Sequence, residues 1–410
     1  MAEQHEKALV PQIRFAGFTD PWEQRKLGEL YKEVSEKNDL TYGRDRIISV
    51  AHMYFNPVVY VTEDDYLKTY NVMRLGDIAF EGNRSKNFAH GRLVENTIGD
   101  GIVSHVFKVF RPIRPFDLMY WKYSINNEKA MKDVLTRSTK ASTMMHELVA
   151  KDFLNEEIAV PSLEEQRQIG AFFDRLDSLI TLHQRKYDKL CVLKKSMLDK
   201  MFPKGGSLYP EIRFAGFTDP WEQRKLCEIA AFGGGHTPSM SDPDNYEGGN
   251  VLWVTSQDVK SYYLDGTTTQ ITEKGEKELT LYPMGALVMV TRSGILRHTL
   301  PVAELCKPST VNQDIRVILP QEDKCCGKWL LQFFISRNKE LLLEFGKTGT
   351  TVESVDFSKM KDMILRMPSL SEQRQIGLYF ARLDNLVTLH QRKLELLRNI
   401  KKSMLDKMFV

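Results

Sequence analysis

Long hydrophobic runs are missing from this chain of 410 residues. No stretch approaches the ~20 apolar residues that a membrane-spanning helix needs. The first ten residues, MAEQHEKALV, also lack the apolar core of a signal peptide. Hydrophobic residues make up 42% of the chain and charged residues 27%, which is ordinary for a globular protein of two or three domains. We therefore expect a cytoplasmic protein with no membrane contact.

Cysteine is scarce, and charge of either sign is hardly in excess. The five cysteines are Cys191, Cys227, Cys306, Cys325 and Cys326. Their number is odd and no two have C-x-x-C spacing, so reduced thiols are expected and a metal site is not. The 57 Lys and Arg nearly cancel the 54 Asp and Glu, which leaves a net charge of +3. Such a balance neither indicates nor excludes a nucleic-acid partner, because charge can still gather on one face.

Motifs of catalysis are also lacking. Asp20–Trp22 and Asp219–Trp221 resemble the start of a methyltransferase motif but lack its second proline, so we interpret both as turns. Gly346–Thr348 resembles the end of a phosphate-binding loop, but Leu341 stands where that loop requires glycine. The glycine-rich segment Phe232–His236 does not precede a long helix, and we expect a flexible loop there. The sequence therefore predicts a chain without catalytic residues.

What the sequence does have is a repeat on the scale of a domain. Three blocks recur half a chain later, and they are Ile13–Leu27 with Ile212–Leu226, Glu165–Gly170 with Glu372–Gly377, and Ser196–Phe202 with Ser403–Phe409. The stretches between these blocks barely match. A repeat of this length exceeds the ~20–50 residues of a solenoid unit. The pattern predicts a duplicated frame that carries two divergent inserts.

The second block of each copy predicts a long helix. Ser162–Glu165 and Ser369–Glu372 have the spacing of a capping box, and no proline follows before Pro203 in the first copy. Apolar positions then alternate at steps of four and three, which is typical of a coiled coil of roughly 40 residues and ~60 Å. The expected helix-pair core is Ile169, Phe173, Leu176, Ile180, His183, Leu190, Ile376, Phe380, Leu383, Val387, His390 and Leu397. A second stripe predicts a further surface to bury, and it consists of Phe172, Leu179 and Leu193.

Chain order predicts how these helices run. If the first helix carries the chain from one insert to the other, the second must carry it back, so the two are antiparallel with a pseudo-twofold axis. His183 and His390 are expected near that axis as satisfied polar residues of the seam. Lys194 and Lys401 also fall on the seam, where a charged residue sets register or extends its amine to water.

The two inserts read as small mixed domains, because short β-like runs alternate with turn residues. The predicted strands are Arg46–Ala51, Val58–Thr62, Asp77–Phe80, Val103–Phe110, Val251–Thr255, Ala286–Thr291 and Ile315–Leu319, and the predicted short helices are Leu118–Asn127 and Lys328–Leu343. The expected fold class is α+β, with two globular domains separated by two long antiparallel coiled-coil helices. The expected domains are residues 1–160, 161–203, 204–367 and 368–410, in which the second and fourth are the spacer helices.

Polar and basic loops recur at corresponding places in the two inserts. In each, a glycine turn feeds a strand that runs into an Arg-Ser loop. Arg, Asn and Gln read base edges, while Lys, Ser and Thr hold phosphates. The candidate DNA-binding residues are His52, Arg84, Ser85, Lys86, Asn87, His90, Arg92, Arg137, Ser138, Lys140, Ser256, Gln257, Arg292, Ser293, Arg297, His298, Lys347 and Thr350.

Two features together resemble a known family. Each long helix opens with Pro-x-Leu-x-Glu-Gln-Arg-x-Ile, at Pro161–Ile169 and Pro368–Ile376, and the second insert carries Gly235–Ser239 followed by Trp253–Val259. Nearly the whole chain resembles the DNA specificity subunit of type I restriction–modification enzymes. The resemblance implies that each insert is a target recognition domain for one half of an asymmetric split sequence in double-stranded DNA. It implies that the helices dock two methyltransferase (modification) subunits, and that restriction subunits join them.

The same resemblance implies that cofactors belong to the partners. S-adenosylmethionine would be bound by the modification subunits, and ATP and Mg would be used by the restriction subunits. Two alternatives remain open at this point. The chain could be a stand-alone methyltransferase or nuclease whose catalytic motif differs from those sought, or a coiled-coil adaptor that does not bind DNA.

Overall fold

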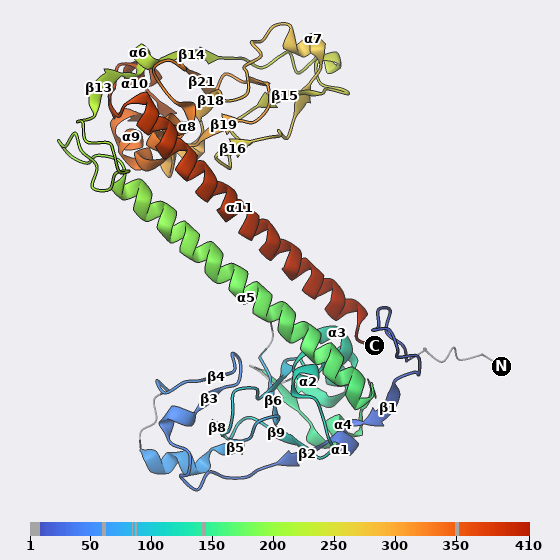
Figure 1. Cartoon of the computed structure of the whole chain (residues 1–410). Coiled ribbons are helices and arrows are strands. Elements are labelled where there is room, and N and C mark those ends of the chain that lie inside the picture. The colour runs from blue at the N-terminus through green and yellow to red at the C-terminus, as the bar shows by residue number, and fades with distance from the viewer. Residues whose placement is uncertain (1–8, 60–62, 84, 87, 142–144, 349–351) are drawn as a thin grey trace. The chain divides into compact units, whose positions relative to one another are not determined.

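The computed structural model describes residues 9–59, 63–83, 85–86, 88–141, 145–348 and 352–410 (Figure 1). The chain forms two compact units: unit 1 is Met1–Gln184 with Arg392–Val410, and unit 2 is Arg185–Gln391. Two 38-residue helices, α5 (Leu163–Lys200) and α11 (Leu370–Lys407), contribute to both units. Each helix is about 57 Å long at ~1.5 Å per residue, so the two predicted long helices are confirmed.

Unit 1 is built on a four-stranded antiparallel sheet with the order β2-β9-β6-β7. Its strands are β1 (Glu23–Lys26), β2 (Tyr31–Val34), β3 (Ile48–Ser49), β4 (Tyr54–Phe55), β5 (Asn71–Met73), β6 (Ile78–Glu81), β7 (Arg92–Glu95), β8 (Gly101–Val103), β9 (Val109–Pro112), β10 (Thr139–Ala141), β11 (His146–Leu148) and β12 (Glu157–Val160). Its shorter helices are α1 (Leu27–Leu30), α2 (Leu118–Ser124), α3 (Glu128–Ser138) and α4 (Ala150–Asn155). Strands β1 and β12 pair and bring the first repeated block to the start of α5.

Unit 2 repeats this plan with a larger sheet, whose order is β14-β21-β18-β19-β16. Its strands are β13 (Glu222–Lys225), β14 (Ala230–Gly234), β15 (Val251–Val254), β16 (Tyr263–Leu264), β17 (Gln270–Ile271), β18 (Leu287–Val290), β19 (Val302–Leu305), β20 (Ser309–Val311), β21 (Ile315–Pro320), β22 (Gly346–Lys347), β23 (Ser354–Val355) and β24 (Ile364–Met367). Its shorter helices are α6 (Leu226–Ile229), α7 (Glu273–Glu276), α8 (Gly327–Ser336), α9 (Asn338–Phe345) and α10 (Phe357–Lys361). Both units therefore mix helices and sheets, as the expected α+β class requires.

Inside each unit the two long helices run antiparallel. In unit 1, Lys401 Nζ lies 2.5 Å from Asp177 Oδ1, and the rings of Phe173 and Phe409 lie 5.9 Å apart. In unit 2, Lys194 Nζ lies 2.5 Å from Asp384 Oδ1, and the rings of Phe202 and Phe380 lie 6.4 Å apart. Residue numbers rise along one helix as they fall along the other in both cases. The predicted antiparallel direction is therefore confirmed in each unit.

The seam of the helix pair is apolar, with a few polar residues. All twelve positions expected in the helix-pair core are buried or half-buried. His183 is buried in unit 1 and His390 is half-buried in unit 2, and each engages a partner. A regular alternation of four and three therefore places one face of each helix inside the protein.

The repeated blocks bind one another, which explains why they recur together. Ser162 Oγ accepts the Glu165 amide proton at 3.3 Å, which is one half of the predicted capping box. The Glu165 carboxylate binds Arg14 Nε and Nη2 at 2.6 and 2.8 Å rather than completing the box. Arg213 binds Glu372 in the same way in unit 2, at 2.8 and 2.7 Å. An Arg–carboxylate fork of this kind fixes both groups in angle as well as distance. We call these repeated, mutually bonded blocks the frame.

The frame also closes unit 1 with residues from opposite ends of the chain. The Ile13 amide donates to Lys407 O at 3.1 Å, as the Ile212 amide donates to Lys200 O at 2.9 Å in unit 2. Met408 and Phe409 then join a buried cluster with Trp22 and Tyr120. In unit 2 the matching cluster contains Met201, Phe202, Trp221 and Trp329, where the chain continues without a break.

Several predicted elements differ from the structure. The strand expected at Arg46–Ala51 is only β3, because a 3-10 turn occupies Arg44–Arg46 before it. Val58 lies in an exposed turn rather than a strand, and residues 60–62 of that prediction fall outside the described chain. The strand expected at Val103–Phe110 is divided by a turn in which the Phe107 amide bonds Ser104 O. The helix expected at Lys328–Leu343 breaks at Arg337 into α8 and α9.

The glycine-rich segment Phe232–His236 is a further correction, since its first three residues lie in a strand rather than in a flexible loop. Residues Ala230–Gly234 form β14, which pairs with β21 over five residues. The backbone of Gly235 lies so close to β20 that a Cβ at this position would be 1.8 Å from Val311 O. Glycine is required at this point because the two backbones touch.

Candidate nucleic-acid interface

Three turns meet at one edge of unit 2. Strands β15 and β20 are parallel, with Val254 opposite Val311, so the turns that follow them lie side by side. The Asn312 amide donates to Val254 O at 2.9 Å, and the Thr291 amide donates to Asp314 O at 2.8 Å. We call the turns at residues 255–258, 291–294 and 312–314 the loop edge of unit 2. It brings together four predicted site residues, Ser256, Gln257, Arg292 and Ser293.

The turn at residues 255–258 is held rigidly by one carboxylate. Asp258 Oδ2 accepts the Thr255 amide and hydroxyl at 2.8 and 2.7 Å. Asp258 Oδ1 accepts the Thr268 amide and hydroxyl, both at 2.8 Å. Burial opposes ionisation of Asp258, but these hydrogen bonds outweigh it and lower the pKa of the carboxyl. The exposed Gln257 side chain therefore stands on a fixed backbone.

The turn after β18 carries most of the positive charge of this edge. Arg292 is exposed and bridges through its backbone to Ser354. Arg297 forms an ion pair with Glu353, which lowers the pKa of that carboxyl, and His298 next to it is exposed. Lys347 lies opposite Ser354 in the β22–β23 pair and is bound to Asp356 at 2.8 Å. Thr350, also predicted here, lies outside the described residues.

Unit 1 has a matching loop edge after β6, the strand that corresponds to β18. The His146 amide donates to Gly82 O at 2.9 Å, and the rings of His146 and His90 lie 5.2 Å apart. Ser85 and Phe88 exchange backbone hydrogen bonds, so Lys86 lies exposed at the tip of a tight turn. Lys140 is exposed on β10 of the adjoining hairpin. Arg84 and Asn87 of the same turn lie outside the described residues.

Arg92 holds this edge together from beneath. Its Nε donates to Glu81 Oε2 at 2.7 Å, its Nη2 donates to Ala51 O at 2.5 Å, and its guanidinium lies 5.2 Å from the centre of the Phe88 ring. Only 23% of the side chain is exposed. His52, which is exposed beside Ala51, is thereby placed next to the turn. Arg92 therefore positions the loops, whereas the sequence suggested a direct DNA contact.

Two further residues that were predicted to bind DNA lie away from this edge. The Ser138 side chain is completely buried and donates to Val134 O at 2.6 Å within α3, so the prediction that it binds DNA is wrong. Arg137 forms an ion pair with Glu156, whose carbonyl accepts the Leu27 amide at the junction with the frame. A serine hydroxyl near the end of a helix readily donates to a carbonyl of the preceding turn. The sequence does not reveal that Ser138 does so, because its burial depends on the tertiary fold.

The structure also adds residues that the sequence did not single out. Tyr54 lies exposed with its ring 6.3 Å from that of His52, and Phe88 and His146 line the turn of unit 1. Gln313 is exposed between the other turns of unit 2, and Thr237 bonds to it. Tyr54 and Phe88 could have been noticed in the sequence as aromatic residues within polar segments, whereas the burial of His146 follows from tertiary contacts. Gln313 follows a short buried strand and has no local signal at all.

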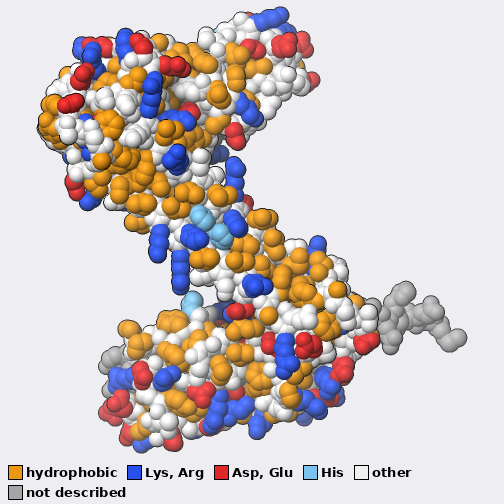
Figure 2. All heavy atoms as spheres, in the orientation of Figure 1, with side chains coloured by type: hydrophobic (Ala, Val, Ile, Leu, Met, Phe, Trp, Pro, Cys, Tyr) orange, Lys and Arg blue, Asp and Glu red, His pale blue; other side chains and the backbone are white. Residues whose placement is uncertain are grey.

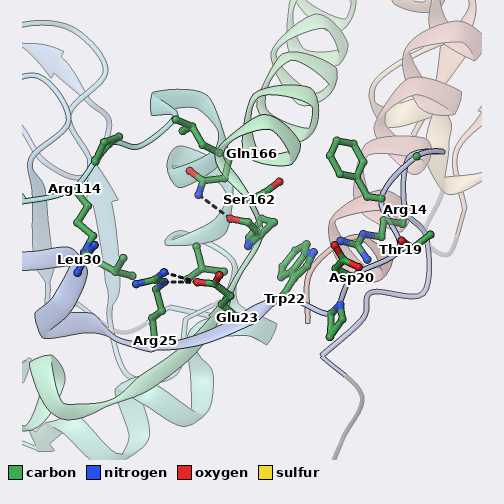
Figure 3. Close-up of a pocket in the computed structure, with 17 residues that line it drawn as sticks. Arg14, Thr19, Asp20, Trp22, Glu23, Arg25, Leu30, Arg114, Ser162 and Gln166 are labelled. Carbon is green, nitrogen blue, oxygen red and sulfur yellow. Dashed lines mark hydrogen bonds and ion pairs between the residues drawn. The ribbon is translucent and has the colours of Figure 1, made fainter.

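A cavity of about 380 Å³ lies in the frame of unit 1 rather than at its loop edge (Figure 3). Arg14, Trp22, Arg25 and Gln166 are among its lining residues. Arg14 is bound to Glu165, Arg25 to Glu23, and Gln166 Nε2 to Pro161 O. The partners of these three polar side chains also belong to the repeated blocks or to the residues beside them, so the cavity belongs to the structural frame.

Charges of both signs are mixed on the face of the molecule that Figure 2 shows. Lys and Arg side chains are interspersed there with Asp and Glu in both units. Among the described residues, no group of three or more His, Cys, Asp or Glu is placed to hold a metal ion. No helix in the described part of the chain is long and apolar enough to cross a membrane. The candidate interface is therefore described by the side chains that its loops carry.

Comparison with known proteins identifies the family. The model of the type I restriction modification DNA specificity domain matches twice, over residues 19–191 and 218–399. The chain is 30% identical over 167 residues to the EcoR124I/EcoR124II specificity subunit of Escherichia coli, covering 40% of this chain and 41% of that protein. It is 22% identical to the MjaVIII specificity subunit of Methanocaldococcus jannaschii, over 94% of this chain and 92% of the relative. The chain thus spans well under two thirds of the first relative and nearly all of the second.

A solved structure agrees on the fold. A type I restriction-modification system S subunit from M. genitalium superposes with a TM-score of 0.57 at 13% identity, covering 98% of this chain and 99% of that one. At this identity the likeness concerns the fold alone. The two matches of the family model include the loop edges of both units and most of both long helices. The chain belongs to the family of type I restriction modification DNA specificity domains, which it carries in two copies.

Proposed function

We propose that this chain is the sequence-reading subunit of a type I restriction–modification complex, in which each unit recognises one half of a split DNA target. One observation carries the proposal: the same frame in both units presents a loop edge with different polar side chains. Unit 1 offers His52, Lys86 and His90, whereas unit 2 offers Gln257 and Arg292. Arginine binds guanine and glutamine binds adenine through two hydrogen bonds each. Different side chains read different bases, so the two half-sites differ and the target is asymmetric.

The helices supply the surface for partner subunits. Besides the buried seam, Leu182 and Leu396 are 45% and 59% exposed in unit 1. Leu386 and Leu389 are 44% and 58% exposed in unit 2, at the positions of the repeat that correspond to Leu179 and Leu182. Figure 2 shows hydrophobic side chains gathered along the long helices. Exposed leucines in rows on a helix are typical of a protein-binding surface.

The exposed leucines of the two units indicate that two copies of one partner protein bind. The exposed pair Leu179 and Leu182 of unit 1 recurs as Leu386 and Leu389 in unit 2 on sequences that are nearly the same, so both units can bind the same protein. We propose that each binds one modification subunit, and that restriction subunits join the complex through them. The predicted second stripe, which includes Leu179 and Leu193, would then be covered by the partner rather than by this chain.

The proposed subunit is not itself an enzyme and binds no cofactor. S-adenosylmethionine would be held by the modification subunits, and ATP and Mg would be used by the restriction subunits. Support comes from the loop edges, whose residues suit base reading and lack the nucleophile–base arrangements of catalysis among the described residues.

The test is a methylome. The chain is expressed with its modification subunits in cells that lack the system, and modified adenines are mapped by single-molecule sequencing. We expect a two-part asymmetric motif, and exchange of residues 28–155 for the matching insert of a relative should alter only one half. Methylation that changes at both halves would refute modular reading. Methyl transfer or DNA cleavage by the purified chain alone would instead establish the stand-alone enzyme.

A further inference from the structure

Two glutamines lie on neighbouring turns of the loop edge of unit 2. Gln257 follows β15 and Gln313 follows β20, and both side chains are exposed. Because β15 and β20 are parallel and in register at Val254 and Val311, these turns leave the sheet at the same level. Carboxyl-terminal turns of adjacent parallel strands point the same way. The two glutamines therefore lie on turns at the same edge of the sheet.

The turn that carries Gln313 is fixed on both flanks. Asn312 is buried at 6% exposure, and its Oδ1 accepts the Asp314 amide at 3.1 Å. The Asn312 carbonyl accepts the Ile315 amide at 3.3 Å. Gln313 thus projects from a turn whose neighbours are held by the protein interior, as Gln257 projects from the turn that Asp258 holds. A reading side chain needs such support, since a loose backbone loses specificity.

The Gln313 amide is itself oriented. Thr237 Oγ1 donates to Gln313 Oε1 at 2.8 Å. Thr237 reaches this place because Gly235 lets the backbone after β14 lie against Val311. A carbonyl oxygen accepts two hydrogen bonds, so Oε1 keeps one free position and Nε2 keeps both of its protons. The oriented amide therefore offers one acceptor and one donor side by side.

We propose that Gln313 reads an adenine in the half-site of unit 2, that Gln257 contacts the adjacent base, and that Thr237 positions the Gln313 amide. Gln313 Oε1 accepts a hydrogen bond from the N6 amine of adenine, and Nε2 donates one to N7, which is the two-bond pattern that distinguishes adenine in the major groove. This inference rests on the proposed function, because it assumes that the loop edge faces DNA. It goes further in naming a base and the residues that select it.

The experiment replaces the amide and its support in the complete complex with modification subunits. Gln313→Ala should relax the preference for adenine at one position of one half-site by about 10- to 100-fold, the usual weight of a two-bond contact. Gln313→Glu should shift the preference at that position toward cytosine, whose N4 amine donates to a carboxylate. Thr237→Val removes only the hydroxyl and should weaken the same preference less. Competition binding with duplexes that differ at single positions measures each preference.

The control is Gln270→Ala, an exposed glutamine on β17 that lies opposite Leu252, at the other end of β15. It should leave every preference unchanged. The inference is overturned if Gln313→Ala keeps the adenine preference, or if all positions of the half-site weaken equally. If Gln313→Ala lowers the melting temperature, Thr237→Val decides, since a change confined to the same base supports the inference and no change refutes it. A wild-type complex that modifies no two-part motif would refute the proposed function instead.

Discussion

The carboxylate of Asp384 in α11 binds three side chains. The shortest contact is the ion pair with Lys194 of α5, whose Nζ lies 2.5 Å from Asp384 Oδ1. Gln332 Nε2 and Tyr263 Oη donate to Oδ2 of the same carboxylate at 3.3 and 3.2 Å. Burial and the adjacent carboxylate raise the pKa of Tyr263, so its hydroxyl stays protonated. One carboxylate therefore joins both long helices of unit 2 to the globular part.

Removing this carboxylate should be costly. Asp384→Ala leaves Lys194, which is 9% exposed, buried without its partner, and a buried charge left alone costs about 3–5 kcal/mol. Asp177→Ala in unit 1 should cost less, because the side chains of its pair with Lys401 are 32% and 25% exposed. Urea denaturation, monitored by hydrogen exchange in each unit, measures the loss of stability that each variant causes. The double variant Lys194→Met/Asp384→Leu should recover part of the loss, and equal losses for Asp384 and Asp177 would contradict this account.

The stability of unit 1 should depend on pH through Glu95. Burial, and next the negative charge of Asp117, raise the pKa of this carboxyl well above its usual value near 4.5. Folding therefore favours the protonated form, so its contribution to stability is complete below pH 4.5 and is lost as pH rises through the raised pKa. Glu95→Gln should flatten this loss and raise the melting temperature of unit 1 at neutral pH.

The control for that experiment is Glu36, whose contribution to stability should change with pH in the opposite direction. Arg74 and Arg111 bind Glu36 and lower the pKa of its carboxyl. Its contribution is present above pH 4.5 and is lost as pH falls through the lowered pKa. Glu36→Gln should therefore lower the melting temperature at neutral pH. Melting curves from pH 3 to pH 8 compare the two variants, and parallel curves for Glu95→Gln and wild type would rule out Glu95.

Arg292 should contribute to base selection by unit 2. Its side chain is exposed at the loop edge, and an arginine bonded twice to guanine is worth about 1–3 kcal/mol. Arg292→Ala should weaken binding to the specific target and relax one base of one half-site. Arg137→Ala, which breaks the ion pair with Glu156 beside the frame, is the matched control and should leave all base preferences intact. Unchanged preferences in Arg292→Ala would remove that residue from the interface.

The exposed leucines should govern how many modification subunits bind. Leu182→Arg in unit 1 or Leu389→Arg in unit 2 should each remove one partner, because a charge cannot enter an apolar contact without a large desolvation cost. The double variant should remove both partners. Native mass spectrometry counts the subunits. Thr388→Arg changes an exposed neighbour on α11 and should leave both partners bound, and a full complex with Leu389→Arg would contradict the docking surface.

The long helices were predictable because their signal is periodic and repeated. Ile169, Phe173, Ile376 and Phe380 fall on a strict alternation of four and three, and all four are buried. The strands at the core of unit 2 were predictable for a similar reason, since β18 is a continuous apolar run and β21 is apolar except for Arg316. Pattern reasoning succeeds where burial follows sequence spacing.

The loop edges were only partly predictable, because tertiary contacts decide them. The sequence suggests that Arg92 is an unpaired cation, but its guanidinium donates hydrogen bonds to Glu81 and to the Ala51 carbonyl. Gln313 gains its place from Val254 and Thr237, which are far away along the chain. The role of Glu165 was half predicted, since local spacing indicates a cap but cannot reveal Arg14.

The composition of the two units fixes the order in which they can fold during synthesis. Unit 2 is continuous from Arg185 to Gln391, so all of its core exists once that stretch has left the ribosome. Unit 1 also needs Met408 and Phe409, which pack in its core with residues made long before. The core of unit 1 is therefore complete only after the last helix has emerged, and until then the surface that Met408 and Phe409 cover is left open to the aggregation that exposed apolar surface favours.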